Sequence, residues 1–97
     1  MDVMHGDFVW NSHKEKANVL KHRVDFFCAV KAFGDPERRI IKDELHSSSE
    51  DRYFCLGKVD GWVLTVRFVY RENRIRILGA GYWRKGKELY GQEKDRS

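Results

Sequence analysis

Cations and aromatic side chains gather in one segment near the C-terminus, RENRIRILGAGYWRKGKELYG, which spans residues 71–91. Between residues 67 and 87 a single acid, Glu72, is outnumbered by seven basic side chains: Arg67, Arg71, Arg74, Arg76, Arg84, Lys85 and Lys87. The whole chain carries a net charge of +4, so the rest of it is net acidic. A local excess of this kind favours an anionic partner, such as nucleic acid or an acidic protein segment, over a general role in solubility.

Two adjacent aromatic residues, Tyr82 and Trp83, interrupt this basic segment. Aromatic rings beside cations can stack on bases while the cations neutralise phosphates. The alternative is an ordinary hairpin whose arginines lie over apolar neighbours such as Val69 and Leu78 and face water. Gly86 falls inside an expected short helix, where glycine costs about 1 kcal/mol relative to alanine. That cost indicates either a close approach to the backbone or a kink without function.

The hairpin that carries the arginines can be registered from its alternation of apolar and polar residues. In WVLTVRFVY one face is expected to hold Trp62, Leu64, Val66, Phe68 and Tyr70, and the other Val63, Thr65, Arg67 and Val69. Pairing Tyr70 with Ile75 keeps the apolar faces together, and it sets two further pairs, Phe68 with Ile77 and Val66 with Gly79. A one-residue slip would send arginines into the core. The preferred register gathers four cations on one side of two adjacent strands: Arg67, Arg71, Arg74 and Arg76.

Motifs of metal-dependent or nucleophilic chemistry are absent from the sequence. The four histidines, His5, His13, His22 and His46, do not pair with another His or a Cys at the spacing of HxxxH or CxxC. There is no GxSxG or P-loop, and GAG at residues 79–81 lacks the third glycine of a dinucleotide-binding loop. We therefore expect no metal and no cofactor. His22 is expected at the end of a helix, where the dipole favours it.

The N-terminal third is expected to hold a short strand and two helices. FVW, residues 8–10, is apolar and short enough for a strand. Ser12 and Glu15 are spaced as a capping box for a first helix whose apolar face would be Ala17, Leu20 and Val24. Asp25 can cap a second helix with a core-facing stripe of Phe26, Phe27, Ala29, Val30 and Phe33. GDP at residues 34–36 ends it.

The remainder is rich in β-forming runs. RRIIKDEL, RYFCLGK, WVLTVRFVY and RIRILGA are separated by polar or turn-forming residues. The pattern predicts an α+β domain with two N-terminal helices packed on a small antiparallel β-sheet of four strands, followed by a short C-terminal helix. A chain of 97 residues is expected to form a single domain, residues 1–97, with residues 91–97 as a flexible tail.

The cellular compartment is expected to be the cytoplasm. No apolar run approaches the roughly 18 residues of a membrane span, and the start of the chain is acidic where a signal peptide would be basic. Without an export signal the environment is reducing, so Cys28 and Cys55 are expected as buried thiols and not as a disulfide.

The order of these motifs resembles the BrnT family, ribonuclease toxins of bacterial type II toxin–antitoxin pairs. The matching pieces are FVW, then KHRVDF with the following F.DP up to Pro36, the acidic SSSEDRYFCLG, and VLTVRFVYRENRIRIL followed by a basic helix that ends at Tyr90. Together they cover about residues 8–91. The resemblance implies a RelE-like fold and metal-independent cleavage of RNA that blocks translation. It also implies neutralisation by a ribbon-helix-helix antitoxin, similar to BrnA, in a higher-order assembly.

The resemblance also implies roles for particular residues. Arg74 and Arg76 occupy the paired arginines of the family's RIRI strand, and His22 the histidine of its KH motif. The family commonly has Ser-Ala-Arg-Lys-Ala after that strand, and this chain has GAGYW, so Gly81 stands where the family has an arginine. We expect Arg84 and Lys85 to supply its charge one turn later.

A catalytic assignment follows from the needs of RNA cleavage, which are a proton acceptor, cations for the phosphorane and a proton donor. The expected catalytic residues are Arg74, Arg76, Arg84, Lys85 and His22. The expected RNA-binding residues are Arg67, Arg71, Tyr82, Trp83, Lys87 and Tyr90. The competing hypothesis is a toxin-like fold without catalysis, which uses the same basic surface to bind an antitoxin or RNA.

Overall fold

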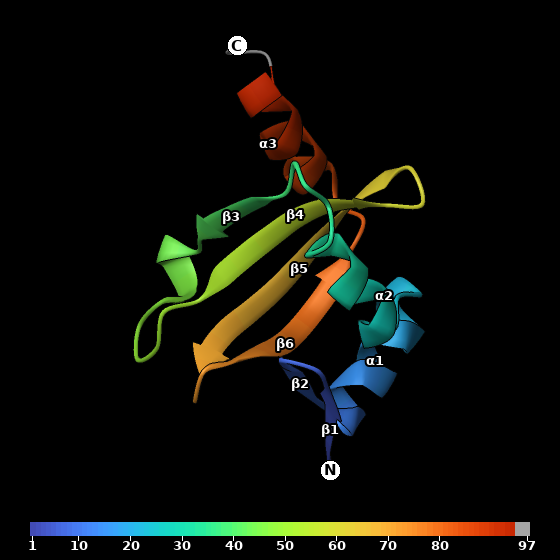
Figure 1. Cartoon of the computed structure of the whole chain (residues 1–97), viewed down its shortest axis with the longest axis vertical. Helices are drawn as coiled ribbons and strands as arrows, with labels where there is room; N and C mark the ends of the chain where they lie inside the picture. Colours follow the sequence, from blue (N-terminus) through green and yellow to red (C-terminus); the bar gives the residue numbers. More distant parts are fainter. Residues whose placement is uncertain (95–97) are drawn as a thin grey trace.

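The computed structural model describes residues 1–94 and contains a six-stranded mixed sheet with three α-helices packed on it (Figure 1). The strands are β1 (Asp2–His5), β2 (Phe8–Asn11), β3 (Arg39–Lys42), β4 (Tyr53–Val59), β5 (Trp62–Arg71) and β6 (Arg74–Gly81). The helices are α1 (Ser12–His22), α2 (Phe26–Ala32) and α3 (Arg84–Lys94), with a single 3₁₀ turn at Glu44–His46. The order across the sheet is β1-β2-β6-β5-β4-β3.

The expected fold, two N-terminal helices on a small antiparallel sheet in a RelE-like arrangement, is wrong. A β1–β2 hairpin precedes the helices, and β2 pairs in parallel with β6, joining Phe8 to Ile75 and Val9 to Arg76. The helices α1 and α2 therefore follow a strand that belongs to the same sheet, not a free N-terminus. The four later strands, β3 to β6, do form consecutive antiparallel pairs.

The β5–β6 hairpin has the predicted register at its turn and a different one farther along. Tyr70 lies opposite Ile75 and Phe68 opposite Ile77, which confirms both pairs. An irregularity between Arg67 and Phe68 then shifts the pairing. Val66 consequently faces Ala80 in place of the predicted Gly79, because a β-bulge inserts one extra residue into one strand.

The start of α1 is capped by Asn11 and not by the predicted Ser12. The Asn11 side chain accepts hydrogen bonds from the backbone N–H groups of His13 (2.9 Å) and Lys14 (3.1 Å). Glu15 has another task, since its carboxylate accepts from Trp10 Nε1 at 3.0 Å and from the backbone N–H of Phe26 at 2.9 Å. It thereby ties β2 to the start of α2. The predicted Asp25 cap of α2 is confirmed by a 2.7 Å bond from the Cys28 N–H.

The buried face of α1 also differs from the prediction. Ala17 and Leu20 are exposed, whereas Asn18 is buried. The Asn18 amide bonds both the N–H and the C=O of Ala80 (3.1 and 2.9 Å), as a neighbouring strand would. It also donates to the carbonyl of Val24 at 2.9 Å. Because a buried backbone group without a partner is costly, this amide covers the edge of β6 that no strand pairs with.

Helices cover both faces of the sheet. On one face α1 and α2 pack on a core that includes Trp10, Phe26 and Phe68, each fully buried. On the other face, Tyr90 of α3 packs with Leu56 and Val63. Burial of each large apolar side chain contributes roughly 1.5–3 kcal/mol. The alternate residues of β5 therefore point into two separate cores, and the arginines lie on the face that α3 covers only in part.

The two cysteines are free thiols, with Cys55 buried and Cys28 half-buried. Burial raises the pKa of the Cys55 thiol to about 12, so it stays protonated. Among residues 1–94, no helix is long and apolar enough to cross a membrane. Residues 91–94, expected as part of a flexible tail, continue α3, and residues 95–97 lie outside the described residues.

Candidate nucleic-acid interface

Four arginines lie on one face of the β5–β6 hairpin, as the alternation predicts, and we call them the basic face: Arg67, Arg71, Arg74 and Arg76. Directly opposed residues of an antiparallel pair point to the same side of a sheet. Arg71 lies opposite Arg74, and Arg76 lies opposite Val69. Arg67 shares this side because it alternates with Val69 and Arg71 along β5.

Arg76 is held by a carboxylate from the first strand. Its Nη2 donates to Asp2 Oδ2 at 2.8 Å and its Nη1 to Oδ1 at 3.3 Å, a bidentate pair. The Arg76 side chain is 20% exposed, and its Nε is buried without a partner among the described residues. Hydrogen bonding to Arg76 lowers the pKa of Asp2, so this carboxylate is ionised at neutral pH.

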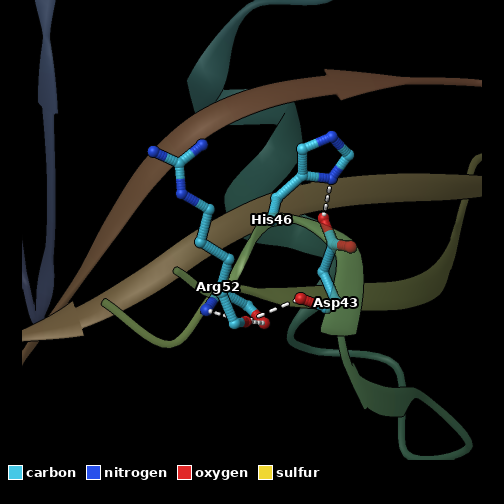
Figure 2. A network of polar contacts seen from close by, with 4 residues as sticks. Asp43, His46 and Arg52 are labelled. Atoms are coloured by element: carbon cyan, nitrogen blue, oxygen red, sulfur yellow. Dashed lines mark hydrogen bonds and ion pairs between the residues drawn. The ribbon is translucent and has the colours of Figure 1, made fainter. Parts of the chain in front are cut away.

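Arg71 is held in the same way by Glu50, at 2.7 Å and 3.0 Å, and this pairing lowers the pKa of Glu50. Glu50 belongs to the β3–β4 connection, which a polar network shapes (Figure 2). In that network His46 Nδ1 lies 2.8 Å from the Asp43 carboxylate, and the Asp43 N–H donates to the Arg52 carbonyl at 2.8 Å. The network brings the two ends of the connection together and so presents Glu50 to Arg71.

The other two arginines have no carboxylate ion pair within the described part of the chain. Arg74 Nη1 donates to the Gly6 carbonyl at 3.2 Å. The Arg67 guanidinium lies over Gly79, where a Cβ would come within 2.5 Å of Arg67 Nη2. Glycine at this position therefore lets Arg67 extend across β6, and its charge remains available to an anion.

Sequence reasoning missed Asp2 and Glu50. Both lie far along the chain from their arginines, 74 and 21 residues away. No local pattern links them, because the contacts exist only once β1 joins the sheet and the β3–β4 connection folds back. Sequence reasoning also assigned no role to Asp35, although this residue belongs to the F.DP motif. Its carboxylate accepts from the Lys58 N–H and the Tyr90 hydroxyl, both at 2.7 Å.

Tyr90, expected to contact RNA, is placed in the core. It is 4% exposed, and burial first, then the bond to Asp35, raises the pKa of its hydroxyl above the usual range. The bond joins α3 to the loop that follows α2. The structure thus gives Tyr90 a role in docking α3 on the sheet.

Gly86 allows α3 to sit directly on β5. A Cβ at this position would lie 1.9 Å from Thr65 Oγ1, so any larger residue would require α3 or the Thr65 side chain to move. The helix-interior glycine is thus explained by a close approach to the backbone, and the approaching group is the sheet. The Thr65 hydroxyl beneath it is buried and has no hydrogen-bond partner among the described residues.

Trp83 occupies the space above Gly81. A Cβ on Gly81 would come within 2.6 Å of the Trp83 ring, so an arginine cannot stand there while Trp83 keeps this position. The edge of the same ring meets the ring of His22, with centroids 5.1 Å apart. Two of the differences from the family pattern, glycine at 81 and tryptophan at 83, are therefore coupled by packing.

A groove of about 930 Å³ lies beside the start of α3, and its lining includes Trp62, Tyr82, Trp83, Arg84 and Lys87. Trp62 is 67% exposed and Tyr82 44% exposed, so aromatic surface is open to solvent next to cations. Burial first, then the contact with Cys28, raises the pKa of Tyr82 to about 12. This groove brings together four of the expected site residues, Tyr82, Trp83, Arg84 and Lys87.

The expected catalytic residues divide between the two ends of the sheet face. Arg74 and Arg76 lie at the start of β6, whereas His22, Arg84 and Lys85 surround the exit from that strand. Five residues of β6 separate Arg76 from the end of the strand, roughly 17 Å at 3.3 Å per residue. The two groups of expected catalytic residues therefore lie at opposite ends of β6.

Within residues 1–94, no group of three or more His, Cys, Asp or Glu side chains is arranged to hold a metal ion. The geometry defines a class of protein: a small α+β domain with a cationic sheet face and a groove that combines aromatic and cationic side chains, features that are also found in proteins that bind single-stranded nucleic acid.

Comparison with known families identifies the family to which the chain belongs within that class. Residues 10–87 match the family model of BrnT, described as the ribonuclease toxin of a type II toxin–antitoxin system. The match spans most of the 97 residues, and the chain therefore belongs to the BrnT family. No curated protein matches the chain significantly. Membership indicates a ribonuclease toxin whose target is RNA and whose partner is an antitoxin.

Proposed function

We propose that this protein is a metal-independent endoribonuclease that cleaves single-stranded RNA in the cytoplasm and thereby blocks translation. The observation that carries the proposal is the basic face, together with the groove of cations and open aromatics at the start of α3. Two of its four arginines, Arg67 and Arg74, have no carboxylate ion pair among the described residues, so intramolecular ion pairs do not account for their place on this face.

The proposed reaction needs no group beyond the side chains present. The 2′-oxygen of one nucleotide attacks the adjacent phosphorus as a base takes its proton, and the bond from phosphorus to the 5′-oxygen breaks as an acid protonates that oxygen. A 2′,3′-cyclic phosphate and a 5′-hydroxyl result. Arginine and lysine side chains would stabilise the charge that develops on the phosphorane.

The geometry divides the proposed roles. Arg74 and Arg76 would hold a phosphate at one end of the face, and Arg67, in the middle, would hold the next. Arg84 would stabilise the reacting phosphate at the α3 end. Lys85 or His22 would exchange the protons, because both lie beside the exit from β6. Trp83 would stack on a base.

The antitoxin is proposed to be a ribbon-helix-helix protein similar to BrnA, with an acidic segment that covers the basic face in a higher-order assembly. Support comes from the two carboxylates that already sit on this face. Asp2 and Glu50 show that bidentate carboxylates fit Arg76 and Arg71. Glutamate or aspartate side chains of a partner could bind Arg67 and Arg74 in the same way.

A second candidate function, binding without catalysis, has one observation in its favour. The Trp83 ring fills the space above Gly81, where relatives commonly have an arginine. If that arginine is indispensable, this chain would bind RNA or antitoxin and not cut RNA. The two functions differ in turnover.

Turnover is therefore the test. Purified protein is incubated with a single-stranded RNA under multiple-turnover conditions, with EDTA and in parallel with magnesium. We expect cleavage at the same rate in both and products that end in a cyclic phosphate. Cleavage only with magnesium would contradict metal independence, and no cleavage in either buffer would contradict the nuclease and favour the binding function.

A further inference from the structure

An apolar pocket of about 230 Å³ opens beneath the first turns of α3 on the same side of the sheet as the basic face. Its lining comprises Phe54, Leu56, Thr65, Trp83, Lys85, Gly86 and Leu89. Phe54 lies directly opposite Arg67 in the pairing of β4 with β5. The pocket therefore adjoins the arginine in the middle of the basic face, and Lys85 brings a second cation to it.

We propose that this pocket receives one unstacked nucleobase of the RNA, and that it sets a base preference. The proposal rests on the proposed function, since it names the part of the substrate that this pocket would recognise. The volume is below the 300–1,000 Å³ of sites for larger ligands, and suits a single ring system. Phe54 and Trp83 offer the aromatic surface on which bases stack.

The charge beside the pocket distinguishes a base from other occupants. Lys85 lines the pocket, and Arg67, which lies opposite Phe54, has no carboxylate ion pair among the described residues. An apolar side chain of a protein partner would leave both cations without a counter-ion, whereas an inserted base is flanked by phosphates. Lys85 and Arg67, on the helix and on the sheet, would neutralise the phosphates that flank the inserted base.

The walls of the pocket are fixed before any ligand arrives. The Trp83 ring is placed by its contacts with His22 and Gly81, and α3 is seated on β5 at Gly86. A prearranged pocket loses little conformational entropy on binding and so can discriminate between bases.

Binding of uncleavable oligonucleotides tests the proposal. Fluorescence anisotropy is used with 2′-fluoro oligo-A, oligo-C and oligo-U, which lack the attacking hydroxyl, at one fixed salt concentration with EDTA. We expect the wild type to prefer one base by about tenfold, within the range of a single mismatched contact. Phe54→Leu, which keeps the apolar character but removes the ring, should weaken binding of that oligonucleotide by about tenfold.

Two substitutions at Phe54 form a matched pair. Phe54→Leu removes the ring and should also reduce the base preference to within about twofold, whereas Phe54→Tyr keeps the ring and should keep the preference. Circular dichroism melting shows whether each variant is folded, and the wild-type comparison of the three oligonucleotides is decisive if Phe54→Leu is not folded. Equal wild-type affinity for all three oligonucleotides, or wild-type binding by Phe54→Leu, would overturn the proposal. The second result is also what a pocket for an apolar side chain of the antitoxin would give.

The outcome is separable from that of the nuclease assay. If the wild type prefers one base but cuts no RNA, the proposal of a base pocket stands and the proposed enzyme activity is refuted. If the wild type cuts RNA and binds every base equally, the enzyme activity stands and the base pocket is refuted.

Discussion

Arg76 of β6 holds Asp2 of β1 through two hydrogen bonds, of 2.8 and 3.3 Å, so the first strand of the chain neutralises an arginine of the basic face. The carboxylate stands where phosphate oxygens would bind. RNA must therefore either displace Asp2 or bind beside a guanidinium that is already paired.

Removing the charge of Asp2 should strengthen RNA binding. In Asp2→Asn the Arg76 guanidinium keeps its place in the sheet but is free to pair with phosphate, so we expect affinity for single-stranded RNA to rise a few-fold. The slope of log affinity against log salt should become steeper by about 0.7, the value for one added phosphate contact on a single strand. The measurement is anisotropy across a salt series. An unchanged slope would show that Arg76 does not reach phosphate.

Acid should destabilise the protein in part through these same pairs. Arg76 and Arg71 lower the pKa values of Asp2 and Glu50 below their ordinary values. A carboxyl group with a depressed pKa contributes stability above its unfolded pKa, about 3.9 for Asp and 4.3 for Glu, and this stability is lost as pH falls through the folded value. We expect the melting temperature of the wild type to decrease when the pH is lowered below about 4. The melting temperature of the double variant Asp2→Asn/Glu50→Gln should decrease less over the same pH range. If the melting temperatures of the wild type and the double variant decrease in parallel with pH, the two ion pairs are not the cause.

Gly86→Ala should destabilise the protein although alanine is the better helix former. The gain in helix propensity is about 1 kcal/mol, but the new Cβ would lie 1.9 Å from Thr65 Oγ1. Overpacking of this kind costs about 1–3 kcal/mol. Urea denaturation measures the change, and Thr65→Ala in the same chain should restore part of it. Additive effects of the two substitutions would show that the contact is not the cause.

Tyr90→Phe should lower the free energy of unfolding and leave the rate of RNA cleavage unchanged. Loss of the hydroxyl bond to the Asp35 carboxylate, at 2.7 Å, is expected to cost about 1–2 kcal/mol in unfolding free energy. Because Tyr90 is buried, RNA cleavage by the folded variant should proceed at the wild-type rate. A reduced rate with normal stability would return Tyr90 to the RNA-binding residues.

The hairpin that carries the arginines was predictable because its information is local. Alternation in two neighbouring strands fixes Tyr70 opposite Ile75, and with it the face on which Arg71, Arg74 and Arg76 lie. The bulge opposite Arg67 and Phe68, where Leu78 is the extra residue of β6, was not predictable, since the alternation of β5 continues through both residues.

The features that were not predicted depend on contacts between distant segments. The parallel pairing of β2 with β6 joins residues that are 67 apart, Phe8 and Ile75. Asn18 interrupts an apolar helix face, and only the free edge of β6 explains its burial. The family pattern identified Arg74, Arg76 and His22 as a group, but it could not show that this group is divided along the sheet.

The most direct test of the central claim, that the basic face binds the RNA that is cleaved, is the cleavage rate of Arg76→Ala in EDTA against that of wild type. Loss of a charge-assisted contact to a phosphate away from the reacting one, about 1.5–3 kcal/mol, should slow cleavage at limiting RNA concentration roughly 10- to 100-fold. Lys16→Ala, which removes an exposed cation on α1 across the sheet, is the matched control and should cut at the wild-type rate. Arg76→Met keeps the buried stem of the side chain, so it reports on charge alone if Arg76→Ala melts early. A folded Arg76→Ala or Arg76→Met that cuts RNA as fast as wild type would contradict the claim.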